Sequence, residues 1–403
     1  MFKEVKEVKK LLLAAAVLSV LAQGCGNLVN QTSAGNQYTN PGSENDTAVL
    51  IDAVYGGNAY SPKIAMDESG NGLAVWRQDD GSSDGIYSSS YDKLTGSWKT
   101  ANLLESTAGN VFLPEIAVNG SGDAVAVWRQ DTKDVYASRY LAAAGRWEAP
   151  KKIENNAEGY IFYLKTAIDD NGDSVIVWQQ LTEAGYNIYF SRSDAATGSW
   201  SDSSPIGTYA GYAYFPELTV DGSGNVIAAW RQWDGNHYSV YANRYDAAGS
   251  AWGETKSMEN ISGNSGDPRA AADAHGNTVI VWQHDAGSIY ANRYNASTKT
   301  WGGVEHVWSV ADSNSGLHVS VDRAGNTAVV WRSRNETKYY VYACRYDVKT
   351  SSWDSARYVG TVPDTANDIT IALNDGKDVM AVWYQNNDGY QGIWYEQYMA
   401  ATL

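Results

Sequence analysis

The chain has 403 residues and a formal net charge of −16, from 30 Lys and Arg against 46 Asp and Glu. A negative charge of this size argues against nucleic acid and against anionic lipid head groups as partners. Aromatic residues make up 12%, too many for a disordered chain, and two Cys exclude a disulfide scaffold. The five His are scattered without a metal-binding motif, so we predict no metal and no cofactor.

Residues 1–24 are predicted to be a signal peptide. Residues 1–10 contain four Lys, and residues 11–22 form an apolar run that is too short to span a bilayer as a stable helix. The run leads into LAQGC at 21–25, which resembles the lipobox of bacterial lipoproteins. The resemblance implies cleavage after Gly24 and lipidation of Cys25; a plain signal peptide with a coincidental Cys is the alternative. Gly26 follows, and by the sorting rule of enterobacterial lipoproteins it favours the outer membrane of the bacterial cell envelope.

The segment of residues 25–46 is rich in Gly, Ser and Asn and shows no periodicity. Such a composition is typical of a flexible linker, so we predict a tether between the lipidated Cys25 and a domain that begins at residue 47. No later apolar run reaches the length of a membrane span. The lipid is therefore the only membrane attachment that the sequence predicts.

One motif occurs seven times after the tether. AVWRQ at 74–78 returns with small changes up to AVWYQ at 381–385, and successive Trp residues lie 49 to 52 positions apart. These residues are Trp76, Trp128, Trp178, Trp230, Trp282, Trp331 and Trp383. A second series closes motifs such as YDKLTGSW at 91–98 and comprises Trp98, Trp147, Trp200, Trp252, Trp301 and Trp353. Two series with the same period predict a structural repeat.

Each unit has the pattern of four short strands. A short apolar strand such as PEIAV at 114–118 leads to a turn such as DGSGN at 221–225, which suits a type I turn with a left-handed Gly. The Trp-containing second strand is almost continuously apolar, which indicates that both of its faces are covered. A third strand such as SIYANRY at 288–294 and a second turn lead to the Trp that starts the fourth strand. No helical period follows residue 24.

Seven four-stranded units predict an all-β fold, a seven-bladed β-propeller of antiparallel blades over residues 47–403. The last unit stops after its third strand, and the segment at 47–65 matches the fourth strand and following first strand at 100–117. We therefore expect residues 47–55 to supply the fourth strand of the last blade and to close the ring.

Differences among the seven units concentrate on one predicted face. The loops between second and third strands and the connections between blades vary in length and chemistry, and in a propeller they share a face. A scaffold that diverges there favours a binding site on that face, with neutral drift as the alternative. The predicted ligand-binding residues are Asp79, Asp80, Tyr160, Tyr163, Tyr186, Tyr212, Tyr214, Trp233, Asp234, His237, Tyr238, Tyr339, Tyr340, Asp388 and Tyr390.

Most repeated residues are predicted to be scaffold. Of the 16 Trp, only Trp233 and Trp308 fall outside the repeat, and Trp233 is the strongest ligand candidate because it lies in a variable loop. Cys344 stands where other units have Ser or Asn and is not expected to act as a nucleophile. The repeated Arg residues are expected to tie blades together: Arg77, Arg129, Arg139, Arg192, Arg231, Arg244, Arg293, Arg332 and Arg345.

The hairpin SDAATGSW at 193–200 resembles the Asp-box, S-x-D-x-G-x-T-W, of bacterial sialidase-like propellers, with one extra residue. Kelch repeats are similar in their Tyr-Asp…Trp hairpin, but their Gly-Gly doublet is absent here. Quinone-type propeller repeats, found in outer-membrane assembly scaffold lipoproteins, have a similar Asp-Ala-x-Thr-Gly…Trp hairpin. The sialidase-like grouping is the closest of the three in architecture. It would imply a glycoside hydrolase with an Arg cluster and a Tyr nucleophile, yet the Arg-Ile-Pro motif of sialidases does not occur.

These observations favour a membrane-anchored recognition module that binds a glycan or a protein through aromatic-rich loops. Two alternatives stay open, a scaffold lipoprotein in envelope assembly and a sialidase-like hydrolase. Paired carboxylates such as Asp79 and Asp80 suit acid–base chemistry, but nothing distinguishes them from solvated loop residues. The sequence therefore predicts no catalytic residue.

Overall fold

The structure is a computed structural model. It describes residues 37–39, 47–49, 51, 59–79, 83–105, 109–154, 159–207, 212–285, 287–309, 314–335, 338–362, 367–373, 379–387 and 390–398. Apart from one 3-10 turn, η1 (Ala142–Ala144), the described residues form strands and the turns between them. No helix in these ranges is long and apolar enough to cross a membrane.

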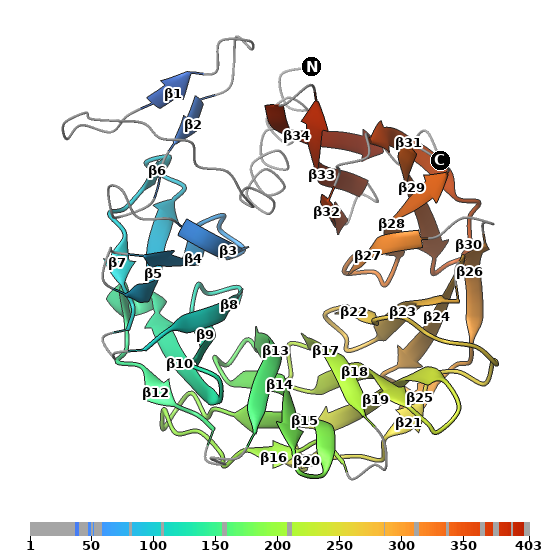
Figure 1. Cartoon of the computed structure of the whole chain (residues 1–403), viewed down its shortest axis with the longest axis horizontal. Coiled ribbons are helices and arrows are strands. Elements are labelled where there is room, and N and C mark those ends of the chain that lie inside the picture. The colour runs from blue at the N-terminus through green and yellow to red at the C-terminus, as the bar shows by residue number, and fades with distance from the viewer. Residues whose placement is uncertain are drawn as a thin grey trace.

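Six sheets share one antiparallel strand order, and a last sheet has three strands. Figure 1 shows the sheets following one another around a ring in chain order, with the first strand of each nearest the centre. These inner strands are β3 (Ala59–Met66), β8 (Val111–Val118), β13 (Tyr160–Ile168), β17 (Ala213–Val220), β22 (Arg269–Ala272), β27 (Asn314–Val321) and β32 (Asn367–Leu373).

The second and third strands form the middle of each sheet. The second strands are β4 (Gly72–Asp79), β9 (Ala124–Gln130), β14 (Ser174–Thr182), β18 (Val226–Trp233), β23 (Thr278–His284), β28 (Thr327–Asn335) and β33 (Val379–Asn387). The third strands are β5 (Asp84–Asp92), β10 (Asp134–Leu141), β15 (Gly185–Arg192), β19 (Tyr238–Asp246), β24 (Ser288–Asn295), β29 (Lys338–Asp347) and β34 (Tyr390–Tyr398).

The outer strand is split in most sheets into two short segments that both pair with the third strand. The first segment contains the second-series Trp, as predicted, in β6 (Ser97–Trp98), β11 (Arg146–Trp147), β20 (Ala251–Trp252), β25 (Thr300–Trp301) and β30 (Ser352–Trp353). The remaining outer segments are β7 (Asn102–Leu103), β12 (Lys151–Lys152), β16 (Ser204–Pro205), β21 (Lys256–Ser257), β26 (Glu305–Ser309) and β31 (Arg357–Val362).

The core lies between neighbouring sheets and is centred on the first Trp series. Trp178 is fully buried and packs with Val127 and Val135 of the preceding sheet. Its indole N–H donates to Gln180 at 2.9 Å, so the ring is buried without leaving its polar atom unsatisfied. Trp308, outside the repeat, joins the same kind of inter-sheet cluster beside Trp331 and is a packing residue.

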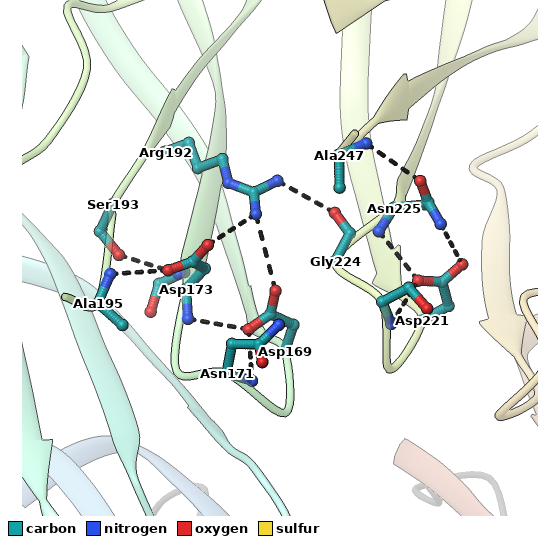
Figure 2. Close-up of polar contacts among 12 residues, drawn as sticks. Asp169, Asn171, Asp173, Arg192, Ser193, Ala195, Asp221, Gly224, Asn225 and Ala247 are labelled. Carbon is teal, nitrogen blue, oxygen red and sulfur yellow. Dashed lines mark hydrogen bonds and ion pairs between the residues drawn. The ribbon is translucent and has the colours of Figure 1, made fainter. Parts of the chain in front are cut away.

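The repeated Asp turns join the strands by hydrogen bonds, as Figure 2 shows for two sheets. Asp169 accepts the backbone N–H groups of Asn171 and Asp173, each at 2.9 Å. Asp173 in turn accepts from the backbone of Ala195, in the second turn of the same sheet, at 2.7 Å. Arg192 contacts Asp173 at 2.9 Å and donates to the carbonyl of Gly224 in the next sheet at 3.1 Å, so this Arg ties neighbouring sheets as predicted.

The expected pairing of the N-terminal segment differs from the one observed. Residues of β2 (Thr47–Val49) pair with β1 (Gln37–Thr39), inside the predicted tether, and β34 has only β33 as a partner among the described strands. Closing the short loop between β1 and β2 costs less chain entropy than pairing the two ends of the domain. Residues 50 and 52–55 of the expected closing strand lie outside the described residues, as does Cys25.

Candidate functional site

Six of the seven described inner strands share a bulge close to the variable face, and β22 shows none. The register of β13 against β14 shifts between Phe162 and Lys165, and the same shift occurs in β3, β8, β17, β27 and β32. Inside the bulge one residue has a positive φ, 47° at Tyr163 and 53° at Phe215. Gly316 occupies the equivalent place in β27 at 62°. A large side chain in this conformation costs on the order of 1–3 kcal/mol, and such strain concentrates at functional positions.

The residue before the bulge is aromatic in four consecutive sheets: Tyr60, Phe112, Phe162 and Tyr214. The Arg77 guanidinium lies 4.9 Å from the Tyr60 ring centre and 5.0 Å from that of Phe112. Arg129 lies 4.6 Å from the ring centre of Phe112 and donates to the carbonyl of Ile161 at 2.8 Å. Rings and guanidinium groups thus alternate from the first sheet to the second, and a backbone hydrogen bond links Arg129 to the third.

The row continues through direct ring contacts. The Tyr186 ring centre lies 5.9 Å from that of Phe162 and 5.0 Å from that of Tyr214. Tyr214 contacts Tyr238 at 6.0 Å, and Tyr238 contacts Trp233 edge-on at 5.1 Å. We call the whole row the aromatic belt, and it comprises Tyr60, Arg77, Phe112, Arg129, Phe162, Tyr163, Tyr186, Tyr212, Tyr214, Phe215, Arg231, Trp233 and Tyr238.

Much of the belt faces solvent. Tyr212 is 49% exposed, Tyr163 45% and Tyr60 43%, although Tyr and Phe rings of this size are normally covered. The bulge explains the exposure of Tyr163, because the extra residue turns its side chain away from the alternation of the strand. Tyr163 instead contacts Phe215 of the next sheet, with ring centres 4.5 Å apart.

Arg231 is the best-enclosed cation of the belt. Its guanidinium lies 4.7 Å from the ring centre of Tyr238 and 4.9 Å from that of Phe215. Its Nη1 is 3.4 Å from a carboxylate oxygen of Asp267, and burial raises the pKa of that carboxyl. The Arg231 Nε is buried without a hydrogen-bond acceptor among the described residues. A cation that is held between rings and remains 25% exposed suits the recognition of a polar ligand.

The loop after Trp233 adds an Asp–His pair at one end of the belt. Asp234 accepts the backbone N–H of Asn236 at 2.8 Å and of His237 at 2.9 Å, and these hydrogen bonds hold the pKa of its carboxyl below the usual range. Its second oxygen lies 2.8 Å from Nδ1 of His237. The pair therefore orients the imidazole in the loop that follows Trp233.

Eight of the fifteen predicted ligand-binding residues come together in or beside the belt: Tyr163, Tyr186, Tyr212, Tyr214, Trp233, Asp234, His237 and Tyr238. Tyr160 is exposed at the start of β13 without a ring contact among the described residues. Asp79 ends β4, and Tyr340 lies in β29, two sheets beyond β18. Tyr339 and Tyr390 lie in strands β29 and β34, but their side chains are outside the described set. Asp80 and Asp388 lie outside the described residues altogether. A role in binding stays a prediction for all fifteen.

Sequence reasoning assigned Arg77, Arg129 and Arg231 only to the scaffold. They do tie neighbouring sheets, but they also stack with the exposed rings of the belt. Cys344 takes the place that Ser has in other units, because its thiol donates to the carbonyl of Asp354, as the Ser138 hydroxyl does to that of Glu148. Burial raises the pKa of this thiol, which disfavours the nucleophilic thiolate.

Buried carboxylates at the outer strands were also missed. Glu105, Glu154 and Glu259 are all buried at the end of a split outer strand. Glu259 accepts the backbone N–H of Val240 at 2.6 Å and the hydroxyl of Ser265 at 2.7 Å. Burial raises the pKa of Glu154 to about 7, against the opposing effect of the Lys152 ammonium 3.5 Å away. These groups lie at the sheet edge and do not approach the belt rings in any described contact.

Comparison with known proteins supports the fold. No family model matches the chain, and no curated protein matches it either. The polysaccharide lyase Uly1 is similar with a TM-score of 0.52 at 9% identity, over 83% of this chain and 89% of the lyase. An ulvan lyase solved bound to -[GlcA(1-4)Rha3S]- is similar with a TM-score of 0.50 at 10% identity, over 70% and 79%.

A mutant of the NanB sialidase from Streptococcus pneumoniae also matches, with a TM-score of 0.46 at 11% identity, over 87% of this chain and 70% of the sialidase. At these identities the likeness to the two lyases concerns architecture alone. It shows that the chain has a β-propeller type of fold, built from antiparallel four-stranded sheets.

The raised pKa of Glu154 predicts a specific pH dependence of stability. The folded state keeps the Glu154 carboxyl protonated up to about pH 7, whereas the carboxyl of an unfolded Glu loses its proton at about pH 4.3. The free energy of unfolding therefore falls as pH rises through the range between these two values. Above about pH 7 the full cost of burying the ionised Glu154 carboxylate is present. Glu154→Gln should unfold with a free energy on the order of 1–3 kcal/mol higher than the parent at pH 8, a gap that closes by about pH 4.

Urea unfolding at several pH values measures this difference. Glu68→Gln is the matched control, since the Glu68 side chain is 77% exposed and its replacement should leave the profile unchanged. Parallel profiles for the parent and Glu154→Gln would show that the buried carboxyl does not titrate in this window.

Proposed function

We propose that the protein is a recognition module that binds a glycan along the aromatic belt. The observation that carries this proposal is the extent of the belt, which has rings in four consecutive sheets from Tyr60 to Trp233, with the second and third sheets joined by the hydrogen bond from Arg129 to Ile161. Aromatic faces cover the apolar faces of sugar rings, while tyrosine hydroxyls and guanidinium groups donate to sugar oxygens. A row of such rings matches the repeating units of a chain molecule better than it matches a single small ligand.

The fold is compatible with this role. The two proteins of similar fold are polysaccharide lyases, and one of them is bound to a saccharide. Their chemistry is not transferred to this chain, because a shared fold does not carry a shared reaction. A protein ligand is the second candidate, favoured by the enclosed Arg231 between Tyr238 and Phe215, since Arg and aromatic residues dominate protein interfaces.

We further propose that the module is anchored in a bacterial envelope through a lipid on Cys25, in the outer membrane. The lipobox-like LAQGC at 21–25 and the apolar run before it support this anchor. We also propose that the sheets form seven blades of one ring, closed when the N-terminal segment supplies the fourth strand of the last blade. The match of residues 47–65 to residues 100–117 supports closure, and the pairing of β2 with β1 is then a competing arrangement.

Glycan binding is tested with the full chain carrying Cys25→Ser on an array of polysaccharides. Trp233→Ala and Tyr212→Ala should each weaken binding about tenfold, on the order of 1–2 kcal/mol, because each removes one stacking surface. Neither should lower the free energy of unfolding by more than about 1 kcal/mol, because both rings are partly or largely exposed.

Tyr358→Ala provides the control for this experiment, since Tyr358 is 51% exposed but lies in β31, away from the belt. Its binding should equal that of the parent. Absence of binding to every polysaccharide, or an equal loss in the Tyr358→Ala variant, would contradict a glycan site on the belt and favour the protein ligand.

Ring closure is tested by disulfide trapping. In the first sheet Ser88 pairs with Asn102, and the repeat places Tyr395 and Val49 at the same two positions. The double variant Val49→Cys with Tyr395→Cys should therefore form an intramolecular disulfide on oxidation, in a Cys25→Ser background. The competing arrangement pairs Gln37 with Val49, so the variant Gln37→Cys with Val49→Cys should not crosslink efficiently. The opposite result would establish the local hairpin and an open ring.

Lipid anchoring predicts that bacteria fed a labelled fatty acid incorporate the label into the parent chain. Cys25→Ser should abolish the labelling and move the protein from the membrane fraction to the soluble fraction. Cys344→Ser is the control, since this residue is buried in the domain and should leave the labelling unchanged. Equal labelling of the parent and Cys25→Ser would exclude this anchor.

A further inference from the structure

The fifth sheet carries a His at a place where the first four sheets carry a Gln. His284 ends β23, two residues after the core Trp, and is 6% exposed. The four Gln residues at this place are Gln78, Gln130, Gln180 and Gln232. Three of them accept the indole N–H of the Trp in their own strand at 2.8 or 2.9 Å, through an amide that does not titrate. The replacement of Gln by His therefore puts an ionisable ring into the interior of the fifth sheet.

Both nitrogens of the His284 ring face hydrogen-bond acceptors. Nε2 lies 2.9 Å from the carbonyl oxygen of Ser262. Nδ1 lies 3.1 Å from the hydroxyl oxygen of Ser265 and 3.6 Å from a carboxylate oxygen of Glu259. Because a carbonyl oxygen only accepts, Nε2 carries a hydrogen, and the state of Nδ1 depends on Ser265 and Glu259.

A hydrogen-bonded chain connects Nδ1 of His284 to the buried carboxyl group of Glu259. Ser265 Oγ lies between them, 2.7 Å from Oε2 of Glu259 and 3.1 Å from Nδ1. The chain has two gaps, carboxyl to hydroxyl and hydroxyl to ring, and each gap needs one hydrogen. The hydroxyl supplies one hydrogen, so the other has to be a proton on Glu259 or on Nδ1. Ser265 and Glu259 are buried, so a missing hydrogen leaves two acceptors facing each other away from water.

We propose that Glu259, Ser265 and His284 share one proton and act as a pH-sensitive latch on the connection between the fourth and fifth sheets. With the shared proton present, both gaps are bridged. When pH rises and the proton leaves, the single hydroxyl hydrogen bridges only one gap. A second proton, taken up as pH falls, leaves the hydroxyl hydrogen without an acceptor. Glu259 and His284 therefore titrate as one unit.

The surroundings of the latch favour the state with one shared proton. Burial raises the pKa of the Glu259 carboxyl, so its proton leaves at a higher pH than that of an exposed Glu. Two further ionisable side chains face the His284 ring. Asp285 follows β23 and lies 3.6 Å from Nε2, on the side away from the shared proton, and its side chain is largely exposed. Tyr290 of β24 contacts the ring edge-on, with ring centres 5.6 Å apart.

The latch holds a segment that positions one ring of the aromatic belt. The backbone N–H of Ser265 donates to the carbonyl of Tyr238 at 2.7 Å, and the Tyr238 N–H donates to the side chain of Asn264 at 3.1 Å. Gly263 passes so close to His284 that a Cβ there would lie 2.6 Å from Nε2. Loss of the shared proton should therefore loosen Ser265 and Tyr238 together. The latch does not depend on glycan binding, because its groups are internal and respond to pH without a ligand.

Hydrogen exchange of backbone amides tests the latch in the full chain carrying Cys25→Ser. After correction for the intrinsic effect of pH, protection of the Ser265 amide should fall about tenfold between about pH 5 and about pH 9, because the chain then lacks one hydrogen bond. The ring resonances of His284 should shift over the same range of pH. Protection of Ser265 that stays constant across this range would overturn the proposal.

Glu259→Gln should remove this loss of protection, because its amide donates to the Ser265 hydroxyl and does not titrate. His284→Gln restores the residue of the first four sheets and should also keep Ser265 protected at alkaline pH. Glu154→Gln is the matched control, since Glu154 is buried at the equivalent place of the second sheet, whose strand β9 ends in Gln130. This variant should lose protection at Ser265 as the parent does. A loss equal to that of the parent in both Glu259→Gln and His284→Gln would show that the two residues share no proton.

Discussion

The burial of one Trp between each pair of neighbouring sheets is the interaction on which the rest of the structure depends. Trp128, Trp178, Trp230, Trp282 and Trp331 are almost completely buried, and their partners come from the adjacent sheet as much as from their own. A single four-stranded sheet has no other way to cover both faces of its second strand. The sheets are therefore stable only side by side, and the strand ends and loops carry little of the packing energy.

Two rows of side chains on the inner strands lie outside this Trp-centred core, one aromatic and one charged. The belt aromatics Tyr60, Phe112, Phe162 and Tyr214 each stand 16 residues before the buried Trp of their sheet. Charged residues of the inner strands stand 13 residues before that Trp: Lys63, Glu115, Lys165, Glu217 and Arg269. The bulge between them contains a residue at positive φ, which reverses the direction of the strand's side chains. One local distortion thus serves two surfaces, an exposed aromatic one and a charged one near the centre of the ring.

The repeated features were predictable from the sequence, and the singular ones were not. Strand order, the buried Trp series and the Asp turns occur in nearly every unit, so the period alone predicts them. Ser, Leu, Tyr and Phe at the bulge give no sign of a left-handed conformation, because no Gly marks it until Gly316. The role of Arg231 was missed because an Arg recurs at its position in other units, whereas its ring neighbours Tyr214, Phe215 and Tyr238, near the starts of β17 and β19, differ in identity from unit to unit. The pairing of β2 with β1 depends on a balance between local and distant partners that a sequence match does not measure.

The position before the bulge has a wider consequence for how such a surface changes over time. Gly266 and Ser315 stand at the equivalent place, 16 residues before the buried Trp, in the fifth and sixth sheets, where β23 and β28 keep that Trp without an aromatic neighbour there. One codon at this place therefore adds or deletes a ring without disturbing the interior. In a protein built from repeated units, the length of the aromatic surface can therefore change one unit at a time. Each unit meanwhile keeps the same buried core.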